Sequence, residues 1–202
     1  MNYLVTGSST GIGRALSERL VAAGHDVFGL ARSVQAPIAG PGTLRAIGCD
    51  VSDWSQVAAA AGKVAATVPH LDGLVACAGI QGELGPALQA DAQRWSDTVR
   101  VNLDGTYFAI RAFASLLARS RRTKIVCLSG GGATKARPNF SAYGAAKTAV
   151  VRLVENIAEE TRGQPFDINA IAPGAINTRL TEEVIRLGPG IVGEAEHAGA
   201  LR

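Results

Sequence analysis

Short apolar runs alternate with longer helical patterns along this chain, and this alternation is what most constrains its fold. Residues 12–23, 53–68, 92–118 and 143–161 carry apolar side chains at helical spacing, with a break expected near Asn102. Strands separated by crossover-length helices form parallel sheets that are covered on both faces. We therefore predict an α/β fold with a doubly wound parallel sheet. The predicted strands are residues 3–7, 25–31, 43–51, 71–79, 124–130 and 166–174.

The length and composition fit one folded domain. The chain has 202 residues, of which 47% are hydrophobic and 18% charged, and this supplies one full core. The sequence has no internal repeat and no low-complexity linker, so we expect a single domain over residues 1–202. Residues 181–202 show no clear helical or strand pattern.

Charge and cysteine content argue against several kinds of partner. The formal net charge of +3 is small and the basic residues are scattered, so we expect no nucleic-acid partner. The N-terminus lacks a signal-peptide pattern and no apolar run reaches about 18 residues, so we expect a cytoplasmic protein without a membrane partner. Cys49, Cys77 and Cys127 lie far apart in or beside apolar runs, which indicates buried reduced thiols and no metal site.

The first predicted strand runs into a glycine-rich turn, TGSSTGIG at residues 6–13, and a helix follows at once. Glycines permit the tight turn and let backbone N–H groups approach a phosphate, while the helix N-terminus adds partial positive charge. Such a loop can also serve only the turn itself. In the first strand-to-helix turn of a doubly wound sheet, however, it indicates a dinucleotide-binding site.

The end of the second predicted strand bears on which dinucleotide is bound. An acidic residue there would hold the ribose 2′-hydroxyl of NAD. The sequence instead reads Leu30-Ala31-Arg32-Ser33, so Arg32 could meet a 2′-phosphate. Arg32 could also be an ordinary surface arginine. We favour NADP over NAD as the cofactor, with NAD still possible.

Tyr143 and Lys147 stand four residues apart, with only small residues between them. In a helix this spacing puts both side chains on one face. A phenol with a pKa near 10 (roughly) is a poor acid or base at neutral pH, and a nearby ammonium lowers that pKa. The pair can therefore be a tuned proton donor or acceptor, or simply the start of an amphipathic helix.

In combination these motifs resemble the short-chain dehydrogenase/reductase family, from Asn2 to about Thr181. TGSSTGIG resembles the family's TGxxxGxG loop, and Tyr143 with Lys147 matches its YxxxK pair. Residues 76–79, ACAG, resemble its NNAG motif with both asparagines replaced. The resemblance implies a Rossmann-like fold. Together with Arg32, it gives these cofactor-binding residues: Gly7, Ser9, Thr10, Gly11, Ile12, Gly13, Arg32, Asp50, Val51, Ala78, Gly79, Tyr143, Lys147, Pro173, Gly174, Ile176 and Thr178.

The resemblance also implies a chemistry. Tyr143 would exchange a proton with the oxygen of a small alcohol or carbonyl substrate while a hydride moves to or from the nicotinamide. Lys147 would lower the pKa of Tyr143 and bind the nicotinamide ribose, and Asn102 would hold a water in a proton relay. Family members are often homo-oligomers, and we expect the same here if the C-terminal part is present.

The sequence departs from the family where a serine normally contacts the substrate carbonyl, thirteen residues before the tyrosine. Gly130 occupies that position, and Ser129 lies one residue earlier, where a strand would point its side chain to the other face. Three interpretations remain open. Ser129 swings into the site, backbone N–H groups of the glycine run polarise the carbonyl, or the site is weak or inactive.

The second departure is the chain's ending. Family members usually continue past the substrate-binding loop into another helix and a final strand, whereas this chain stops at Arg202. We expect residues 180–202 to be the start of that loop, in a truncated form or a naturally short variant.

Two other functions compete with an oxidoreductase. The replaced serine and the altered NNAG motif would suit a non-catalytic dinucleotide-binding protein that senses redox state or acts as a scaffold. An epimerase or dehydratase on the same scaffold is also open, because fold alone does not fix function.

Overall fold

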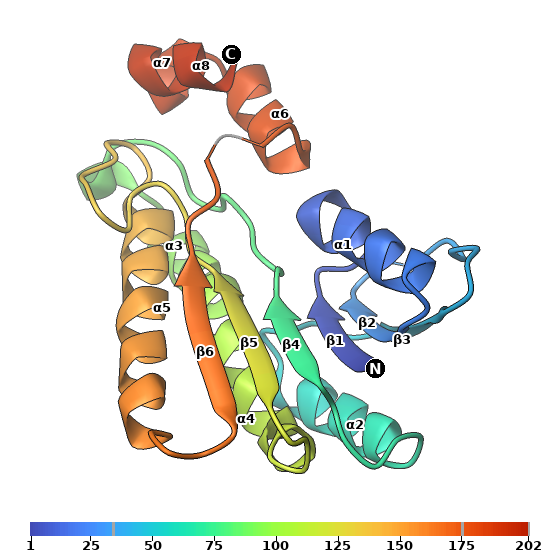
Figure 1. The fold of residues 1–202 in the computed structure, drawn as a ribbon. Coiled ribbons are helices and arrows are strands. Elements are labelled where there is room, and N and C mark those ends of the chain that lie inside the picture. Colours follow the sequence, from blue (N-terminus) through green and yellow to red (C-terminus); the bar gives the residue numbers. More distant parts are fainter. Residues whose placement is uncertain (34, 175, 202) are drawn as a thin grey trace.

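The computed structural model describes residues 1–33, 35–174 and 176–201 and contains one parallel sheet (Figure 1). The strands lie in the order β3-β2-β1-β4-β5-β6, so the chain starts in the middle of the sheet, winds outward to β3 and then returns to β4. This confirms the predicted doubly wound α/β fold. β6 is an outer strand, and among the described residues it pairs with β5 alone. The strands are β1 (Asn2–Thr6), β2 (Asp26–Ala31), β3 (Thr43–Gly48), β4 (Gly73–Ala76), β5 (Thr123–Leu128) and β6 (Phe166–Ile171).

Helices lie on both faces of the sheet, as predicted. One face carries α2, α4 and α5, and the other carries α1 (Figure 1). The helical break expected near Asn102 is a π-helical turn, η2 (Arg100–Asp104), between α3 and α4. None of the helices in the described part of the chain is long and apolar enough to cross a bilayer. The remaining bounds are α1 (Gly11–Ala22), α2 (Trp54–Ala65), the 3₁₀ turn η1 (Ala87–Gln89), α3 (Ala92–Val99), α4 (Gly105–Leu117) and α5 (Ser141–Glu160).

The main core fills the space between the sheet and α2, α4 and α5. Phe28 of β2, Leu74 of β4 and Phe113 of α4 are fully buried there. A smaller core joins β1 and β2 to α1 through Val5 and Val21. Burial of alternate faces along the same strands is what a sheet covered on both sides requires.

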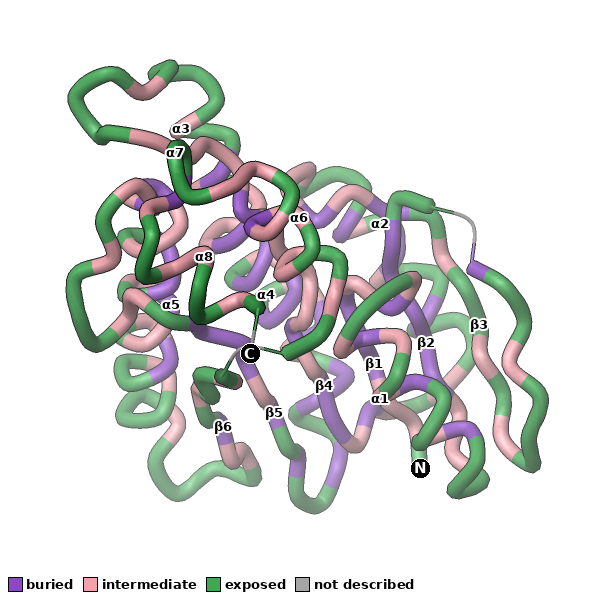
Figure 2. Tube along the Cα trace, turned by 90° about the horizontal axis from the view of Figure 1, so that it is seen from above, coloured by how far each residue is buried: buried purple, intermediate pink, exposed green. Residues whose placement is uncertain are grey.

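The prediction of no clear element in residues 181–202 is wrong. The structure has three short helices there: α6 (Arg179–Leu187), α7 (Pro189–Val192) and α8 (Glu194–Ala200). Gly188 and Gly193, both with positive φ, separate them. α7 and α8 are too short for a periodic pattern, whereas α6 has Leu180, Val184 and Leu187 at helical spacing, a signal that the prediction overlooked. The stability of such short helices comes from packing on residues distant in sequence. Viewed from above, α6 and α8 lie over the carboxyl ends of the strands (Figure 2).

The strand register places the carboxyl ends of neighbouring strands next to one another, along one edge of the sheet. Thr6 of β1 pairs with both Leu30 and Ala76, and Leu128 of β5 pairs with Ile171. The loops that follow β1, β2, β4 and β5 therefore open at one edge, beneath α6. In doubly wound sheets this edge is where ligands bind.

Two helical glycines provide a test of how closely α1 approaches the sheet. A Cβ added to Gly13 would lie 2.4 Å from the Gly7 carbonyl oxygen, whereas one added to Gly62 of α2 would meet nothing within 4 Å. We expect Gly13→Ala to destabilise the protein and Gly62→Ala to stabilise it by up to about 1 kcal/mol through helix propensity. Urea unfolding of both variants measures the difference. Equal effects of the two substitutions would contradict the close approach.

Candidate functional site

A cavity of about 580 Å³ opens at the carboxyl edge of the sheet, under α6. Two predicted residues, Gly174 and Ile176, belong to the segment between β6 and α6 but do not line it. The other predicted site residues all do. They are Gly7, Ser9, Thr10, Gly11, Ile12, Gly13, Arg32, Asp50, Val51, Ala78, Gly79, Asn102, Ser129, Tyr143, Lys147, Pro173 and Thr178.

The glycine-rich turn forms one wall of the cavity. Gly7 and Gly11 have φ values of 67° and 56°, a region that glycine adopts without strain. The Gly7 N–H donates to the Leu30 carbonyl at 2.8 Å, and a Cβ on Gly7 would lie 2.8 Å from the backbone of Ala78. Position 7 is thus packed too tightly for any side chain. It leads directly into α1, whose first N–H groups have no intrahelical acceptors and suit a phosphate.

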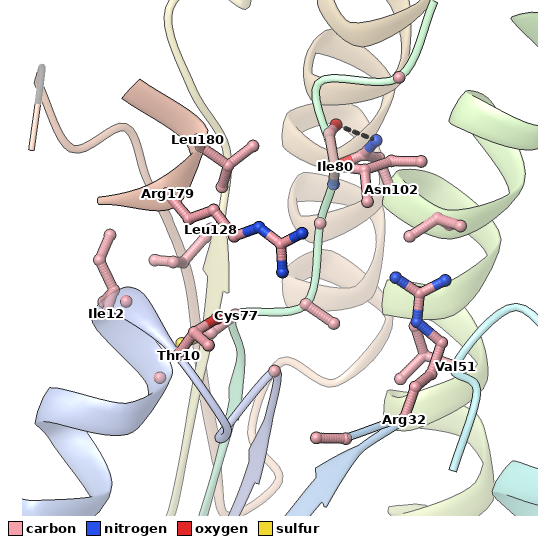
Figure 3. A pocket seen from close by; sticks show the side chains of 18 of the residues that line it. Thr10, Ile12, Arg32, Val51, Cys77, Ile80, Asn102, Leu128, Arg179 and Leu180 are labelled. Carbon is pink, nitrogen blue, oxygen red and sulfur yellow. Dashed lines mark hydrogen bonds between the residues drawn. The ribbon is translucent and has the colours of Figure 1, made fainter. Parts of the chain in front are cut away.

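Two arginine side chains extend into the cavity from opposite sides (Figure 3). Arg32 directly follows β2 and lies beside Val51, and Arg179 is the first residue of α6. Neither forms an ion pair with any residue in the described ranges. A cation at a helix N-terminus opposes the helix dipole, and in α6 the carboxylate of Glu182 in the first turn counters this effect of Arg179. Arg179 was not among the residues predicted from the sequence, although it directly follows Thr178.

Asn102 fixes the loop after β4 to the turn between α3 and α4. Its fully buried side chain donates to the carbonyl oxygen of Ile80 at 2.9 Å (Figure 3) and to that of Thr98, also at 2.9 Å. A Cβ on Gly79 would lie 2.7 Å from Asn102 Oδ1 and 3.5 Å from Lys147 Nζ. The absence of a side chain at Gly79 therefore leaves room for Asn102 and Lys147 to lie on either side of it in the cavity wall.

Tyr143 and Lys147 both belong to α5 and both line the cavity. Lys147 is 4% exposed, and its ammonium donates to the Leu128 carbonyl oxygen at 2.9 Å. The Nζ atom lies 5.7 Å from the centre of the Tyr143 ring. Burial lowers the pKa of Lys147 to about 8, because desolvation disfavours the charged form.

The pKa of Tyr143 differs in direction from the sequence expectation. Burial raises it, and the cation that opposes this rise is Arg137, not Lys147. The sequence pattern identified the helical neighbour of the tyrosine. It could not reveal the degree of burial, or an arginine that the loop before α5 brings close.

Ser129 does not point at the phenol. It is buried, and its hydroxyl donates to the Lys147 carbonyl oxygen at 2.9 Å. A Cβ on Gly130 would lie 2.4 Å from the Tyr143 hydroxyl, so the phenol occupies the space that a side chain at residue 130 would need. In this arrangement Ser129 anchors the backbone of α5 to the end of β5.

This geometry can be compared with known proteins. A family model described as short chain dehydrogenase matches residues 2–186, which is most of the chain. The chain belongs to the short-chain dehydrogenase family. The family's proteins bind NAD or NADP and act as oxidoreductases on alcohols and ketones. No group of three or more potential metal ligands occurs within residues 1–33, 35–174 and 176–201.

Several characterised family members resemble this short-chain dehydrogenase. D-threitol dehydrogenase of Mycolicibacterium smegmatis is 33% identical over 184 residues, covering 88% of this chain and 70% of that protein. Galactitol 2-dehydrogenase of Cereibacter sphaeroides is 34% identical, covering 88% and 72%. The structure of Thermoplasma acidophilum aldohexose dehydrogenase superposes with a TM-score of 0.85 at 31% identity, covering 98% of this chain and 75% of that one.

Lys147 gives a prediction for the pH dependence of stability. Its pKa is about 8 in the folded protein and near the ordinary value of 10.5 when unfolded, so the unfolded chain binds more protons between these values. The cost of burying this lysine is complete below pH 8 (roughly), and stability rises with pH through that window as the cost is relieved.

Urea unfolding of the wild type and of Lys147→Met across the window isolates this effect. We expect the free energy of unfolding of the wild type to rise with pH relative to the methionine variant. Lys63→Met, at an exposed position of α2, is the control and should parallel the wild type. A flat difference between the wild type and Lys147→Met would contradict the lowered pKa.

Proposed function

We propose that this protein is an NADP-dependent oxidoreductase that interconverts an alcohol and a ketone, with Tyr143 as the general acid and base. The observation that carries the proposal is the convergence of the glycine-rich turn, Asn102, Tyr143 and Lys147 on one cavity. A non-catalytic nucleotide site needs no phenol beside a buried ammonium. When bound, the nicotinamide supplies or accepts the hydride.

The chain's own residues have distinct roles in this proposal. The turn at residues 7–13 and the start of α1 hold the pyrophosphate, and Asp50 and Val51 border the adenine. Lys147 is held at the cavity wall by the Leu128 carbonyl and contacts the nicotinamide ribose. The raised pKa of Tyr143 keeps the phenol protonated at neutral pH, which suits proton donation to a carbonyl oxygen.

Arg32 supports the proposed preference for NADP, while Arg179 supports dinucleotide binding in general. Arg32 lies at the end of β2, where a 2′-phosphate would be met, and no carboxylate follows that strand. Arg179 lies on the α6 side, and a Cβ on Gly11 would be 3.5 Å from the side chain of the adjacent Thr178. This places the start of α6 over the glycine-rich turn, so Arg179 is suited to the pyrophosphate.

Three of the similar enzymes, among others with different substrates in their names, support a polyhydroxylated substrate. D-threitol, galactitol and aldohexose dehydrogenases all act on polyols or sugars. In this chain Glu83, Arg94, Asp97 and Thr98 give the cavity a polar end that could bind several hydroxyl groups. A small polyol or the corresponding ketose is therefore our first choice for substrate screening.

One observation favours a second function. Gly130 replaces the usual serine, and the Ser129 hydroxyl is bonded to the Lys147 carbonyl, so neither residue offers a side-chain hydroxyl to the substrate carbonyl. A dinucleotide-binding protein without turnover, acting as a redox sensor or scaffold, is the alternative candidate.

Replacement of the phenol hydroxyl separates these functions. We expect Tyr143→Phe to lower turnover by about 10²- to 10⁴-fold, because a positioned acid or base contributes that much. Dinucleotide affinity should change little. Tyr107→Phe, at an exposed position of α4, is the control. Steady-state rates with polyols and ketoses, alongside fluorescence titration with NADPH, provide the readout. Unchanged turnover in Tyr143→Phe would contradict the proposed catalysis.

Arg32 can be tested separately by comparing the two dinucleotides. We expect the wild type to bind NADPH more tightly than NADH, and Arg32→Gln to lose most of that preference by weakening NADPH binding alone. Arg45→Gln, at an exposed position of β3 outside the cavity, should behave like the wild type. A wild type that binds NADH more tightly would contradict the choice of cofactor.

A further inference from the structure

Arg137 is a largely buried arginine next to the proposed catalytic tyrosine. It lies in the loop between β5 and α5, and its side chain is only 14% exposed. Its guanidinium carbon stands 3.6 Å from the centre of the Phe140 ring and 5.6 Å from the centre of the Tyr143 ring. A buried charge is costly unless it is paired, so this position requires a partner.

The partner is Glu196 of α8. Its Oε2 atom accepts a hydrogen bond from Arg137 Nε at 2.9 Å and lies 2.8 Å from Arg137 Nη2 in the ion pair. A cluster of Phe140, Val184 and Val192 brings α8 to this place by packing the C-terminal helices onto the start of α5. Tyr143 packs against the same cluster. The ion pair and the cluster therefore hold the C-terminal helices against the tyrosine ring.

Two cations stand at nearly equal distances from that ring, Lys147 Nζ at 5.7 Å and the Arg137 guanidinium at 5.6 Å. The two side chains differ in whether they keep their positive charge as the pH rises. An arginine stays charged at all accessible pH values. The buried Lys147 can lose its proton at mildly alkaline pH, and its ammonium is already engaged by the Leu128 carbonyl. Arg137 is thus the cation beside the phenol whose charge does not change.

We propose that Arg137 is a positioning residue for Tyr143. Anchored by Glu196 and stacked on Phe140, its guanidinium keeps a fixed positive charge beside the phenol and ties α8 to the active-site loop. The inference rests on the proposed function for Tyr143 as the acid and base. Phosphate-binding and catalytic motifs do not predict it, because both partners lie outside them.

Other titratable groups near the cluster do not replace this cation. Glu83, in the loop after β4, has its carboxylate 2.9 Å from Arg94. The ring of His197 on α8 faces the Ile185 carbonyl at 3.2 Å. The thiols of Cys77 and Cys127 lie near Lys147, and burial raises the pKa of each to about 12.

The two halves of the ion pair should have opposite effects on the phenol. In Arg137→Gln the positive charge is lost, so Tyr143 should titrate at higher pH. In Glu196→Gln the positive charge loses its counterion, so Tyr143 should titrate at lower pH. A Coulomb interaction at this range corresponds to shifts of about 0.5 to 1 pH unit in each direction. Arg137→Lys should restore most of the wild-type behaviour, and Glu194→Gln, an exposed carboxylate on the same helix, should have no effect.

The readout is the pH titration of the tyrosine Cζ resonances in ¹³C-tyrosine-labelled protein, with Tyr143 assigned from its absence in Tyr143→Phe. This measurement needs neither substrate nor dinucleotide. Loss of an ion pair that served only structure would loosen the ring in both variants and move both titrations the same way. Shifts in the same direction, or no shift in either variant, would overturn the inference.

A second readout follows the proposed reaction. The pH profile of turnover should move with the Tyr143 titration in each variant, at unchanged NADPH affinity. If the wild type shows no turnover, the proposed function fails while the resonance titration still decides the role of Arg137. If turnover is present and depends on Tyr143 but the titrations do not move in opposite directions, the inference about Arg137 fails alone.

Discussion

A reciprocal pair of hydrogen bonds between the end of β5 and α5 underlies the arrangement of the whole site. The Lys147 ammonium donates to the Leu128 carbonyl, and the Ser129 hydroxyl donates to the Lys147 carbonyl. Each bond satisfies a buried polar group that would otherwise be costly, and together they fix the rotation of α5 about its axis. That rotation aims Tyr143 into the cavity and places Lys147 against Gly79. The glycine-rich turn and the loop after β4 then need only to reach the same sheet edge, which the register of the strands ensures.

Much of this fold could be predicted from the sequence because it depends on local patterns. The apolar runs and the helical spacing between them predict the succession of strands and helices along the chain, from β1 to β6. The glycines at residues 7, 11 and 13 predict the tight turn after β1. The break in helical structure near Asn102 could also be predicted from the sequence. These features need no knowledge of which residues meet in space.

The parts that were missed depend on contacts between distant residues. The short helices α6 to α8 are held by packing on Phe140. The spacing of Leu180, Val184 and Leu187 indicates that α6 has an apolar face, but it does not identify Phe140 as the residue that covers it. Arg179 and Arg137 reach the site because α6 and the β5–α5 loop cross its rim. The predicted direction of the Tyr143 pKa shift was wrong for the same reason. The shift depends on burial, which the folded surroundings determine and the Tyr-x-x-x-Lys spacing does not.

Gly130 has a consequence for how this site can change over evolutionary time. Because the Tyr143 hydroxyl fills the space next to its Cα, any side chain introduced there must first displace the phenol. A substitution to serine therefore requires the phenol of Tyr143 to move, although the clashing hydroxyl is the far end of a side chain and its movement does not require a shift of α5. Residue 130 and the placement of the Tyr143 phenol are therefore coupled, so that a change at this position also changes where the reactive hydroxyl lies.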